Sequence, residues 1–286
     1  MTKNVGFIGP GKVGCSLGRH IAENGRGFAV RGYYGRSEEA AREAAAFTDS
    51  SAFGAPEELA ATCDLLLLTV PDKHIADVWD SLSGKLAYRN KPLYVGHCSG
   101  SQNSGIFCPK TGCHFGSIHP VLAVHDKESS YKNFAGAFFT IEGDEAFSAL
   151  ADELLTSLGN PFDFIEADQK TRYHAASVMV SNLVCALTYE GMETFKACGL
   201  DEEFSESAWR SLFLGNAQNT ATAGPVQALT GPIERGDTAT VARHLEALTG
   251  DAREIYLVLS RILIKTASQK NPDRDYSDLI KLLEGI

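Results

Sequence analysis

Three glycines near the start of the chain have the spacing of a phosphate-binding turn. They follow an apolar run from Val5 to Ile8 and precede a helical pattern of apolar residues. In such a strand–turn–helix unit, the first glycine permits the tight turn, the second lets the backbone approach a pyrophosphate, and the third lets the helix pack on the strand. Free backbone N–H groups at the helix N-terminus favour the phosphate charge. The alternative is a glycine-rich turn with no ligand. The predicted dinucleotide-binding residues in this turn are Gly9, Pro10, Gly11, Lys12, Val13 and Gly14.

The end of the second expected strand indicates which dinucleotide binds. An NAD site usually holds the adenosine ribose with a carboxylate about 20 residues beyond the glycines. No Asp or Glu lies between Ala29 and Ser37, and Arg36 stands beside Ser37 at that point. A guanidinium can hold a 2′-phosphate through charge-assisted hydrogen bonds, and a hydroxyl can add one more. We therefore expect NADP(H). On the other interpretation, Arg36 is a surface charge and Ser37 only caps a helix.

Further polar residues follow other apolar runs of the first half. In an open α/β sheet, ligands bind beyond the carboxyl ends of the strands. We therefore expect two of these turns to contact the cofactor, through Val70, Pro71, Asp72, Cys98 and Ser99. By the same reasoning, Cys98-Ser99-Gly100 and the segment from Ser117 to Pro120, which contains His119, are expected at the edge of the site.

A line of polar side chains follows in the second half. Lys170, His174, Ser177 and Ser181 fall at i, i+4, i+7 and i+11 of an otherwise apolar helical pattern, and Asn182 borders them. The pattern predicts a buried helix. Burying such groups costs several kcal/mol unless they find partners, so the line suggests a wet cleft beside the nicotinamide end of the cofactor. Alternatively, these are satisfied core polar groups, or they bind a partner subunit.

A rigid connection rich in glycine and proline is expected between residues 224 and 237. Asp237 is a good N-cap for the helix after it. Arg235 could bind a substrate carboxylate, or it could pair with a structural acid.

Composition limits the possible partners. The 286 residues suit two domains, and 44% hydrophobic residues suffice for a sizeable core. A net charge of −10 without a basic patch argues against nucleic acid or an anionic membrane as a partner. The start of the chain leads straight into a strand, which leaves no room for a signal peptide, and no apolar run is long enough to span a bilayer. Seven scattered cysteines fit reduced thiols in a cytoplasmic protein.

The order of elements predicts the fold class. Short apolar runs alternate with helical patterns up to about residue 166, as in an α/β domain with a mostly parallel sheet of Rossmann type. Only helices are expected beyond it. We therefore expect a dinucleotide-binding domain at 1–166 and an all-helical domain at 167–286. The expected strands are 28–34, 64–70, 93–97, 114–118, 137–142 and 162–165, in addition to the first. The expected helices are 37–47, 57–61, one from about Lys73 capped by Asp72, 145–158, 168–198, 205–222, 237–248, 251–268 and 277–283.

Histidines and cysteines also gather between residues 97 and 119. A zinc site would need four of them in tetrahedral order. Cys108 and Cys113 are five residues apart and do not form a close C-x-x-C pair. We expect no metal.

The combined motifs carry a family resemblance over nearly the full length. The first half resembles the NADP-binding domains of ketopantoate reductase, pyrroline-5-carboxylate reductase and prephenate dehydrogenase. The whole chain more closely resembles Rossmann-like proteins with a C-terminal DUF2520 domain, through the glycine turn, Val70-Pro71-Asp72, His97-Cys98-Ser99-Gly100, Ser117-Ile118-His119-Pro120, Tyr173-His174-Ala175-Ala176, Ser181-Asn182 and Leu229–Asp237. The resemblance implies an all-helical C-terminal domain like that of 6-phosphogluconate dehydrogenase, a homodimer, and no particular substrate.

Two related families offer patterns for the reacting residues. Hydroxyacid dehydrogenases use a helical K-x-x-x-N pair, but Lys170 is followed at i+4 by His174, so the pair is absent. Prephenate dehydrogenases carry a histidine in an H-P turn that contacts the substrate hydroxyl, and His119 is similar.

Two functional hypotheses follow. The first is an NADP-dependent oxidoreductase that transfers a hydride to or from a small carbonyl, imine or hydroxy-acid substrate. His119 or His174 would be the acid or base, since imidazole transfers protons near neutral pH. Asn182 and Ser99 would orient the substrate, and Lys170 would help electrostatically. The second hypothesis is a sensor or scaffold that binds NADP(H) without turnover.

Overall fold

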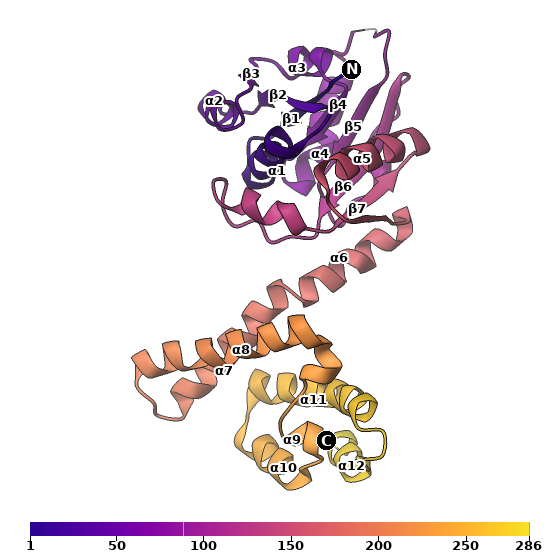
Figure 1. Ribbon diagram of the computed structural model, residues 1–286. Helices are drawn as coiled ribbons and strands as arrows, with labels where there is room; N and C mark the ends of the chain where they lie inside the picture. Colours follow the sequence, from indigo (N-terminus) through magenta and orange to yellow (C-terminus); the bar gives the residue numbers. More distant parts are fainter. Residues whose placement is uncertain (88, 286) are drawn as a thin grey trace. The chain divides into compact units, whose positions relative to one another are not determined.

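The computed structural model describes residues 1–87 and 89–285, and the chain divides into two compact units. The first unit is Met1–Val178 and the second is Met179–Ile286. Each unit is described below by itself (Figure 1).

One mixed sheet forms the centre of the first unit. Within the described residues it has eight strands in the order β3-β2-β1-β4-β5-β6-β7-β8. All neighbouring strands are parallel except β6 and β7, which are antiparallel. This order, which extends outward on both sides from β1 and β4, confirms the expected α/β fold of Rossmann type. The strands are β1 (Lys3–Ile8), β2 (Phe28–Tyr34), β3 (Ser51–Ala52), β4 (Leu65–Leu68), β5 (Leu93–His97), β6 (Cys113–Pro120), β7 (Phe139–Gly143) and β8 (Phe162–Phe164).

Helices cover both faces of this sheet, as Figure 1 shows. The central strand β4 consists of four leucines that are all buried, since a parallel strand between two helical layers has no solvent face. Leu65 and Leu67 belong to the core under α1, α2 and α5, and Leu66 and Leu68 belong to the core under α3 and α4. The helices are α1 (Lys12–Asn24), α2 (Glu38–Phe47), α3 (Pro56–Thr62), α4 (Ile75–Ser83) and α5 (Glu145–Leu158), and the short 3₁₀ segments are η1 (Asp72–His74), η2 (Ser104–Ile106), η3 (Ser130–Gly136) and η4 (Ala167–Gln169).

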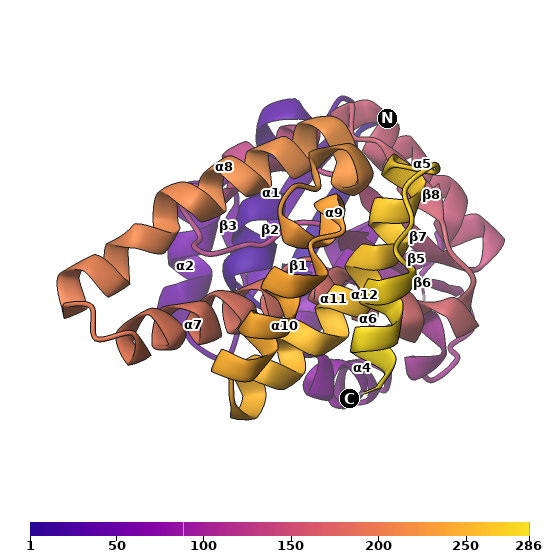
Figure 2. The same ribbon diagram turned by 90° about the horizontal axis from the view of Figure 1, so that it is seen from below.

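Helices alone make up the described part of the second unit (Figure 2). The helix α11 is central to this unit, since it contacts α7, α8, α9, α10 and α12. The buried apolar core is small and comes from α9 to α12 and the turn before α12. The elements are α7 (Asn182–Ala197), α8 (Glu202–Ala228), α9 (Pro232–Arg235), α10 (Thr238–Ala247), α11 (Gly250–Lys270) and α12 (Ser277–Glu284). No helix among the described residues is long and apolar enough to cross a membrane.

The helix expected at 168–198 is in fact two helices. The helix α6 (Lys170–Met179) ends before Val180, and α7 begins at Asn182. The predicted polar line therefore breaks before Ser181. The prediction of a buried helix is wrong. Of the residues of α6, Lys170 alone is buried, and at the end of the helix Met179 is 61% exposed and Val180 79% exposed.

The division between the units lies later than the expected boundary at residue 166. All of α6 except Met179 belongs to the sheet unit, and Lys170 and Tyr173 bond to β6 and to the turn after β5. Two short elements, β3 and α9, were not expected, since neither is long enough to show a periodic pattern.

Candidate functional site

The glycine turn has the geometry that its spacing predicts. Gly9 has φ +108°, which side chains rarely adopt, and a Cβ there would lie 2.7 Å from the Thr69 carbonyl oxygen. A Cβ on Gly14 would lie 2.5 Å from Thr69 Oγ1 and 2.6 Å from the Gly9 carbonyl oxygen. At Gly11, by contrast, the nearest such atom is the Thr69 carbonyl oxygen at 3.8 Å, an ordinary van der Waals contact, so this position is not crowded. Gly9 and Gly14 are thus needed for packing, and Gly11 leaves room for a ligand.

The helix α1 begins directly at this turn. Its N-cap is Gly11, which provides no side-chain cap, so the first backbone N–H groups are left for a ligand or water. A cleft of about 570 Å³ opens beside the turn. It brings together seven of the predicted cofactor residues, namely Gly9, Pro10, Gly11, Arg36, Ser37, Val70 and Pro71. A nucleotide fits this place because it combines a helix N-terminus without a side-chain cap, an uncrowded glycine and an exposed guanidinium.

Other predicted cofactor residues do not line that cleft. Lys12, Val13 and Gly14 belong to the first turn of α1, and Asp72, Cys98 and Ser99 lie at the next strand ends. Sequence reasoning missed a group of lining residues on the far side, which the amphipathic pattern after Pro71 could have indicated: His74, Asp77, Val78, Ser81, Leu82 and Lys85.

Ser37 has the structural role that was considered as the alternative. Its Oγ accepts a hydrogen bond from the Ala40 N–H at 3.2 Å and caps α2. The hydroxyl proton stays available, because a serine oxygen can accept and donate at once. Capping and phosphate binding are therefore compatible.

Asp72 does not cap a helix, which corrects the sequence-based expectation. No side-chain cap is made at the start of η1 or α4. The Asp72 carboxylate instead accepts hydrogen bonds from Ser99 Oγ at 2.5 Å and from Ser101 Oγ at 3.2 Å. Ser99 Oγ also accepts from the N–H groups of Ser101 and Gln102, so these contacts fix the turn after β5.

Lys170 is a buried cation in this unit, only 1% exposed. Its Nζ donates to the Ser99 carbonyl oxygen at 3.0 Å and to Ser117 Oγ at 2.5 Å. Ser117 Oγ donates in turn to Glu142 Oε2 at 3.1 Å, and Glu142 also accepts from the backbone and hydroxyl of Ser104. Burial lowers the pKa of Lys170 to about 8, against the opposing effect of Glu142. Lys170 thus acts on its surroundings through its charge and through the turn that it holds.

His119 and His174 face each other beside this cation. His119 Nδ1 and the Tyr173 hydroxyl are 2.7 Å apart, and the two imidazole rings are nearly perpendicular, with centroids 6.1 Å apart. A Cβ on Gly100 would lie 2.7 Å from His174 Nδ1 and 2.8 Å from His119 Nε2. Within the described residues, His174 Nδ1 is buried without a hydrogen-bond partner. Burial, followed by the charge of Lys170, lowers the pKa of His119 to about 4, so this ring is neutral near pH 7.

The neighbours of Ser99 have no exposed reactive group. His97 is fully buried, its Nδ1 accepts from the Ser99 N–H at 3.2 Å, and burial lowers its pKa to about 4. Burial also raises the pKa of the Cys98 thiol to about 12, which keeps it protonated and a poor nucleophile. All seven cysteines lie in the described part of the chain and are free of disulfides.

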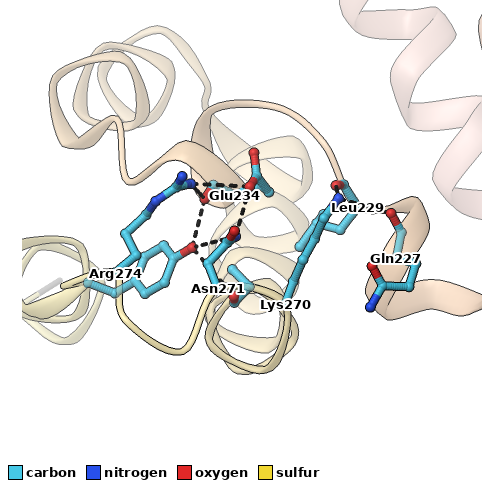
Figure 3. Close-up of polar contacts among 8 residues, drawn as sticks. Gln227, Leu229, Glu234, Lys270, Asn271 and Arg274 are labelled. Carbon is cyan, nitrogen blue, oxygen red and sulfur yellow. Dashed lines mark hydrogen bonds and ion pairs between the residues drawn. The ribbon is translucent and has the colours of Figure 1, made fainter.

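The remaining predicted site residues lie in the second unit. Ser181 Oγ donates to Asn182 Oδ1 at 3.2 Å. Arg235 is exposed at the end of α9, and the carboxylate next to it is engaged elsewhere: Figure 3 shows Glu234 accepting hydrogen bonds from Asn271 and Arg274. Lys270 donates to the carbonyl oxygens of Gln227 and Leu229, so these contacts hold the connection that carries Arg235.

The histidines and cysteines between residues 97 and 119 show no metal geometry. Across residues 1–87 and 89–285, no three His, Cys, Asp or Glu side chains are placed to hold a metal ion.

Glu142 was missed as a site residue from the sequence. It lies beside Ser117 only through the antiparallel register of β6 and β7, which no local pattern shows. Ser117 and Gly100 were expected at the edge of the site, and the structure gives their contacts. Tyr173 was named only within the family motif, and its contact with His119 joins segments more than 50 residues apart.

Both parts of the site lie along one edge of the sheet. Strand pairing joins Ile8 to Leu68, Leu68 to His97, and His97 to Ser117, in one row across β1, β4, β5 and β6. The glycine turn follows the first member of this row, and the turn with Gly100 follows the third. This is the edge where open α/β sheets bind their ligands.

The class of protein is defined by two family matches. Residues 2–120 match the Rossmann-like domain, and residues 137–262 match the domain of unknown function DUF2520. The chain belongs to the proteins that combine a Rossmann-like domain with a DUF2520 domain, as its motifs predicted. A comparison with curated protein sequences gives no match.

Solved structures share this fold over nearly the whole chain. Protein TM1727 from Thermotoga maritima is 27% identical, with a TM-score of 0.73 over 93% of this chain and 99% of that one. A candidate NADP oxidoreductase from Bacteroides fragilis is 21% identical, with a TM-score of 0.70 over 92% and 98%. A pyrroline-5-carboxylate reductase from Coxiella burnetii is 16% identical, with a TM-score of 0.60 over 94% and 99%.

Proposed function

We propose that this protein is an NADP(H)-dependent oxidoreductase that transfers a hydride to or from a small carbonyl, imine or hydroxy-acid substrate. One observation carries the proposal: the glycine turn and the polar cluster around Gly100 follow strands that are joined by a single row of paired residues. A dinucleotide bound at the turn runs along this edge toward the cluster. The oxidoreductases among the structural neighbours have the same fold.

The chain supplies binding, orientation and charge. The turn and the N-terminus of α1 would hold the pyrophosphate, and Arg36 with Ser37 would hold the 2′-phosphate of NADP. Asp72, Ser99 and Lys170 stabilise the turn that presents Gly100. The nicotinamide group, when bound, supplies or accepts the hydride.

Calorimetry and absorbance test this proposal on the purified full chain. NADPH should bind more tightly than NADH, and NADPH absorbance should fall with at least one member of a panel of keto acids, aldehydes and cyclic imines. His119→Ala and His174→Ala should each slow turnover by about 100-fold or more, the usual contribution of an acid–base group. His114→Ala is the matched control, since His114 pairs with Asp144 at the opposite end of the same strand. Absence of heat with both reduced dinucleotides would refute the proposal, whereas tight NADPH binding without turnover would assign a sensor or scaffold.

We also propose that the second unit forms a homodimer. Large apolar side chains are exposed on α7, α8 and α11, including Leu212 at 70% and Leu214 at 65%. Exposed apolar surface of this extent marks an interaction site, and symmetric pairing of identical chains is the commonest way to cover it. Light scattering should give twice the monomer mass, and the double variant Leu212→Glu, Leu214→Glu should give the monomer. A wild-type monomer at high concentration would contradict this proposal.

A further inference from the structure

The helical unit contains an apolar groove of about 550 Å³. Two of its walls are helix faces with the same spacing. The face of α7 runs from Leu187 to Cys198 at i, i+3, i+4, i+7, i+8 and i+11, and the face of α11 runs from Ala252 to Leu263 at the same intervals. Each face is about 16 Å long, because a helix rises about 1.5 Å per residue. The groove therefore has the length of about three helical turns.

The lining of this groove is mostly apolar and partly uncovered. Leu187 is 45% exposed and Leu259 38% exposed. The polar members include Glu190 on α7, and His244, whose Nδ1 is 2.8 Å from the Tyr256 hydroxyl. None of the described residues that line the groove comes from α8. Apolar surface of this kind marks an interaction site.

Gly191 lies in the middle of the α7 face. It is exposed, and a Cβ there would meet no atom within 4 Å. Glycine destabilises the interior of a helix relative to alanine, because its backbone loses more freedom on folding. Packing within the described chain does not require a glycine at this position. A second helix that crosses α7 here would require it, since the side chains at a crossing set how closely two helix axes approach.

The middle of α8 is a helix without cover. Every residue from 210 to 219 is exposed, so this stretch is exposed on all sides over about three turns. Figure 1 and Figure 2 both show α7 and α8 extending beyond the cluster of α9 to α12. The stretch contains Leu212, Phe213 and Leu214, which are 70%, 37% and 65% exposed. Gly215 follows them, and no atom lies within 4 Å of its Cβ position either.

We propose that residues 210–219 of α8 in one chain occupy the groove between α7 and α11 of a second copy, and that the two copies exchange these helices reciprocally. Two-fold symmetry repeats the contact, so each chain provides one helix and one groove. This inference rests on the proposed homodimer and states which surfaces form it.

Three properties of the α8 stretch fit the groove. Its length of about three turns matches the two helix faces. With Gly215 on one helix and Gly191 on the other, the two axes can cross closely. Arg210 is the charged residue of the stretch, and it complements Glu190 in the groove. Pairing of two α8 stretches with each other would instead leave the groove and Glu190 uncovered.

Substitution of Gly191 tests the contact. Gly191→Leu places a side chain in the groove without crowding its own chain, so it should fold normally by circular dichroism. Its dimer dissociation constant in analytical ultracentrifugation should rise by at least about 30-fold, because both symmetric contacts lose packing. Gly191→Ala should weaken the dimer by a smaller factor, although alanine favours the helix. Ala186→Leu is the matched control, exposed on α7 outside the groove lining, and should leave the constant unchanged.

A mixture of two variants shows which surfaces pair. Gly191→Leu keeps the α8 stretch and lacks the groove, whereas Leu212→Glu, Leu214→Glu keeps the groove and lacks the stretch. Each variant alone should be monomeric, and an equal mixture should give heterodimers in native mass spectrometry through the one intact contact. Absence of heterodimers, which pairing of α8 with α8 would give, would overturn the inference. An apolar small molecule bound to wild-type monomers and lost in Gly191→Leu would assign the groove to that ligand and overturn it as well.

The same measurements separate this inference from the homodimer itself. A wild-type chain that stays monomeric at high concentration contradicts both. A wild-type dimer that dissociates in Leu212→Glu, Leu214→Glu but persists in Gly191→Leu keeps the homodimer and removes the groove as its contact.

Discussion

The choice between NADP(H) and NAD(H) depends on Arg36 and can be measured with one substitution. Arg36 is exposed at the mouth of the cleft beside the glycine turn, just after β2. Within the described residues it makes no ion pair, so its removal should not change the folded structure. Arg36→Ala therefore removes a potential phosphate ligand and little else.

The expected magnitude follows from the solvent exposure of the guanidinium. A hydrogen bond to a charged group is worth about 1.5–3 kcal/mol, and solvent screening favours the lower end of that range. A loss of about 1.5–2 kcal/mol corresponds to an increase of about 10- to 30-fold in the Kd for NADPH. The Kd for NADH, which lacks the 2′-phosphate, should change by less than about 2-fold.

Isothermal titration calorimetry with both reduced dinucleotides provides the assay. Arg26→Ala is the matched control, because Arg26 is an exposed arginine that precedes β2 and so lies at the opposite edge of the sheet. It removes the same net charge and should leave both affinities unchanged. Equal losses of NADPH and NADH affinity in Arg36→Ala would refute the assignment of the 2′-phosphate to this residue.

Three further predictions concern the turn, the buried imidazole and the buried lysine. Gly14→Ala should lower the free energy of unfolding by about 1–3 kcal/mol, because its Cβ would meet Thr69 and the Gly9 carbonyl oxygen. Gly11→Ala should keep the melting temperature and weaken NADPH binding. Equal melting temperatures for the two variants would contradict the packing assignment. His97 has a folded pKa of about 4, below its ordinary 6.5, so its stabilising contribution is present above pH 6.5 and falls as the pH drops toward 4. Between pH 7 and pH 5 this loss of unfolding free energy is about 2 kcal/mol. Urea denaturation should show it in the wild type and not in His97→Gln, whereas the parallel loss from His119 should persist in both proteins. Identical pH profiles for the two proteins would disprove the contribution of His97. Ser117→Ala removes the hydroxyl between Lys170 and Glu142 and should lower the free energy of unfolding by about 1–3 kcal/mol in the same assay. The exposed Ser129→Ala is the comparison. An unchanged urea midpoint for Ser117→Ala would show that Lys170 and Glu142 do not need this hydroxyl.

Local pattern was enough to predict most of the sheet unit. The strands Phe28–Tyr34 and Leu93–His97 and the helix Glu145–Leu158 have the predicted bounds, because each is a clear apolar period closed by turn or capping residues. The turn at Gly9–Gly14 was predictable because the glycine spacing is local, and Gly9 and Gly14 are required there by backbone conformation and close packing. In these cases the signal lies within about a dozen neighbouring residues.

The polar cluster was only partly predictable, because it depends on pairing between distant segments. Lys170 and His174 were named from their helical spacing, but the residues that contact them come from the turn after β5 and from β6. The register that sets Ser117 beside Glu142 is a property of the assembled sheet. The break of the expected long helix at Val180–Ser181 has no proline or glycine to announce it, so the helical pattern continued across it and Asn182 was expected to border the same face.

The anchoring of Lys170 in the sheet unit determines where the chain can be divided. A protein shortened at residue 166 would lose the ammonium group and leave the buried Glu142 carboxylate with the Ser104 and Ser117 bonds but without that nearby positive charge. A protein that ends after Val178 would retain the balancing positive charge together with both imidazoles. In a chimaera that exchanges the second unit between related proteins, the junction should therefore lie after α6. Each sheet unit then keeps its own Lys170 beside Glu142.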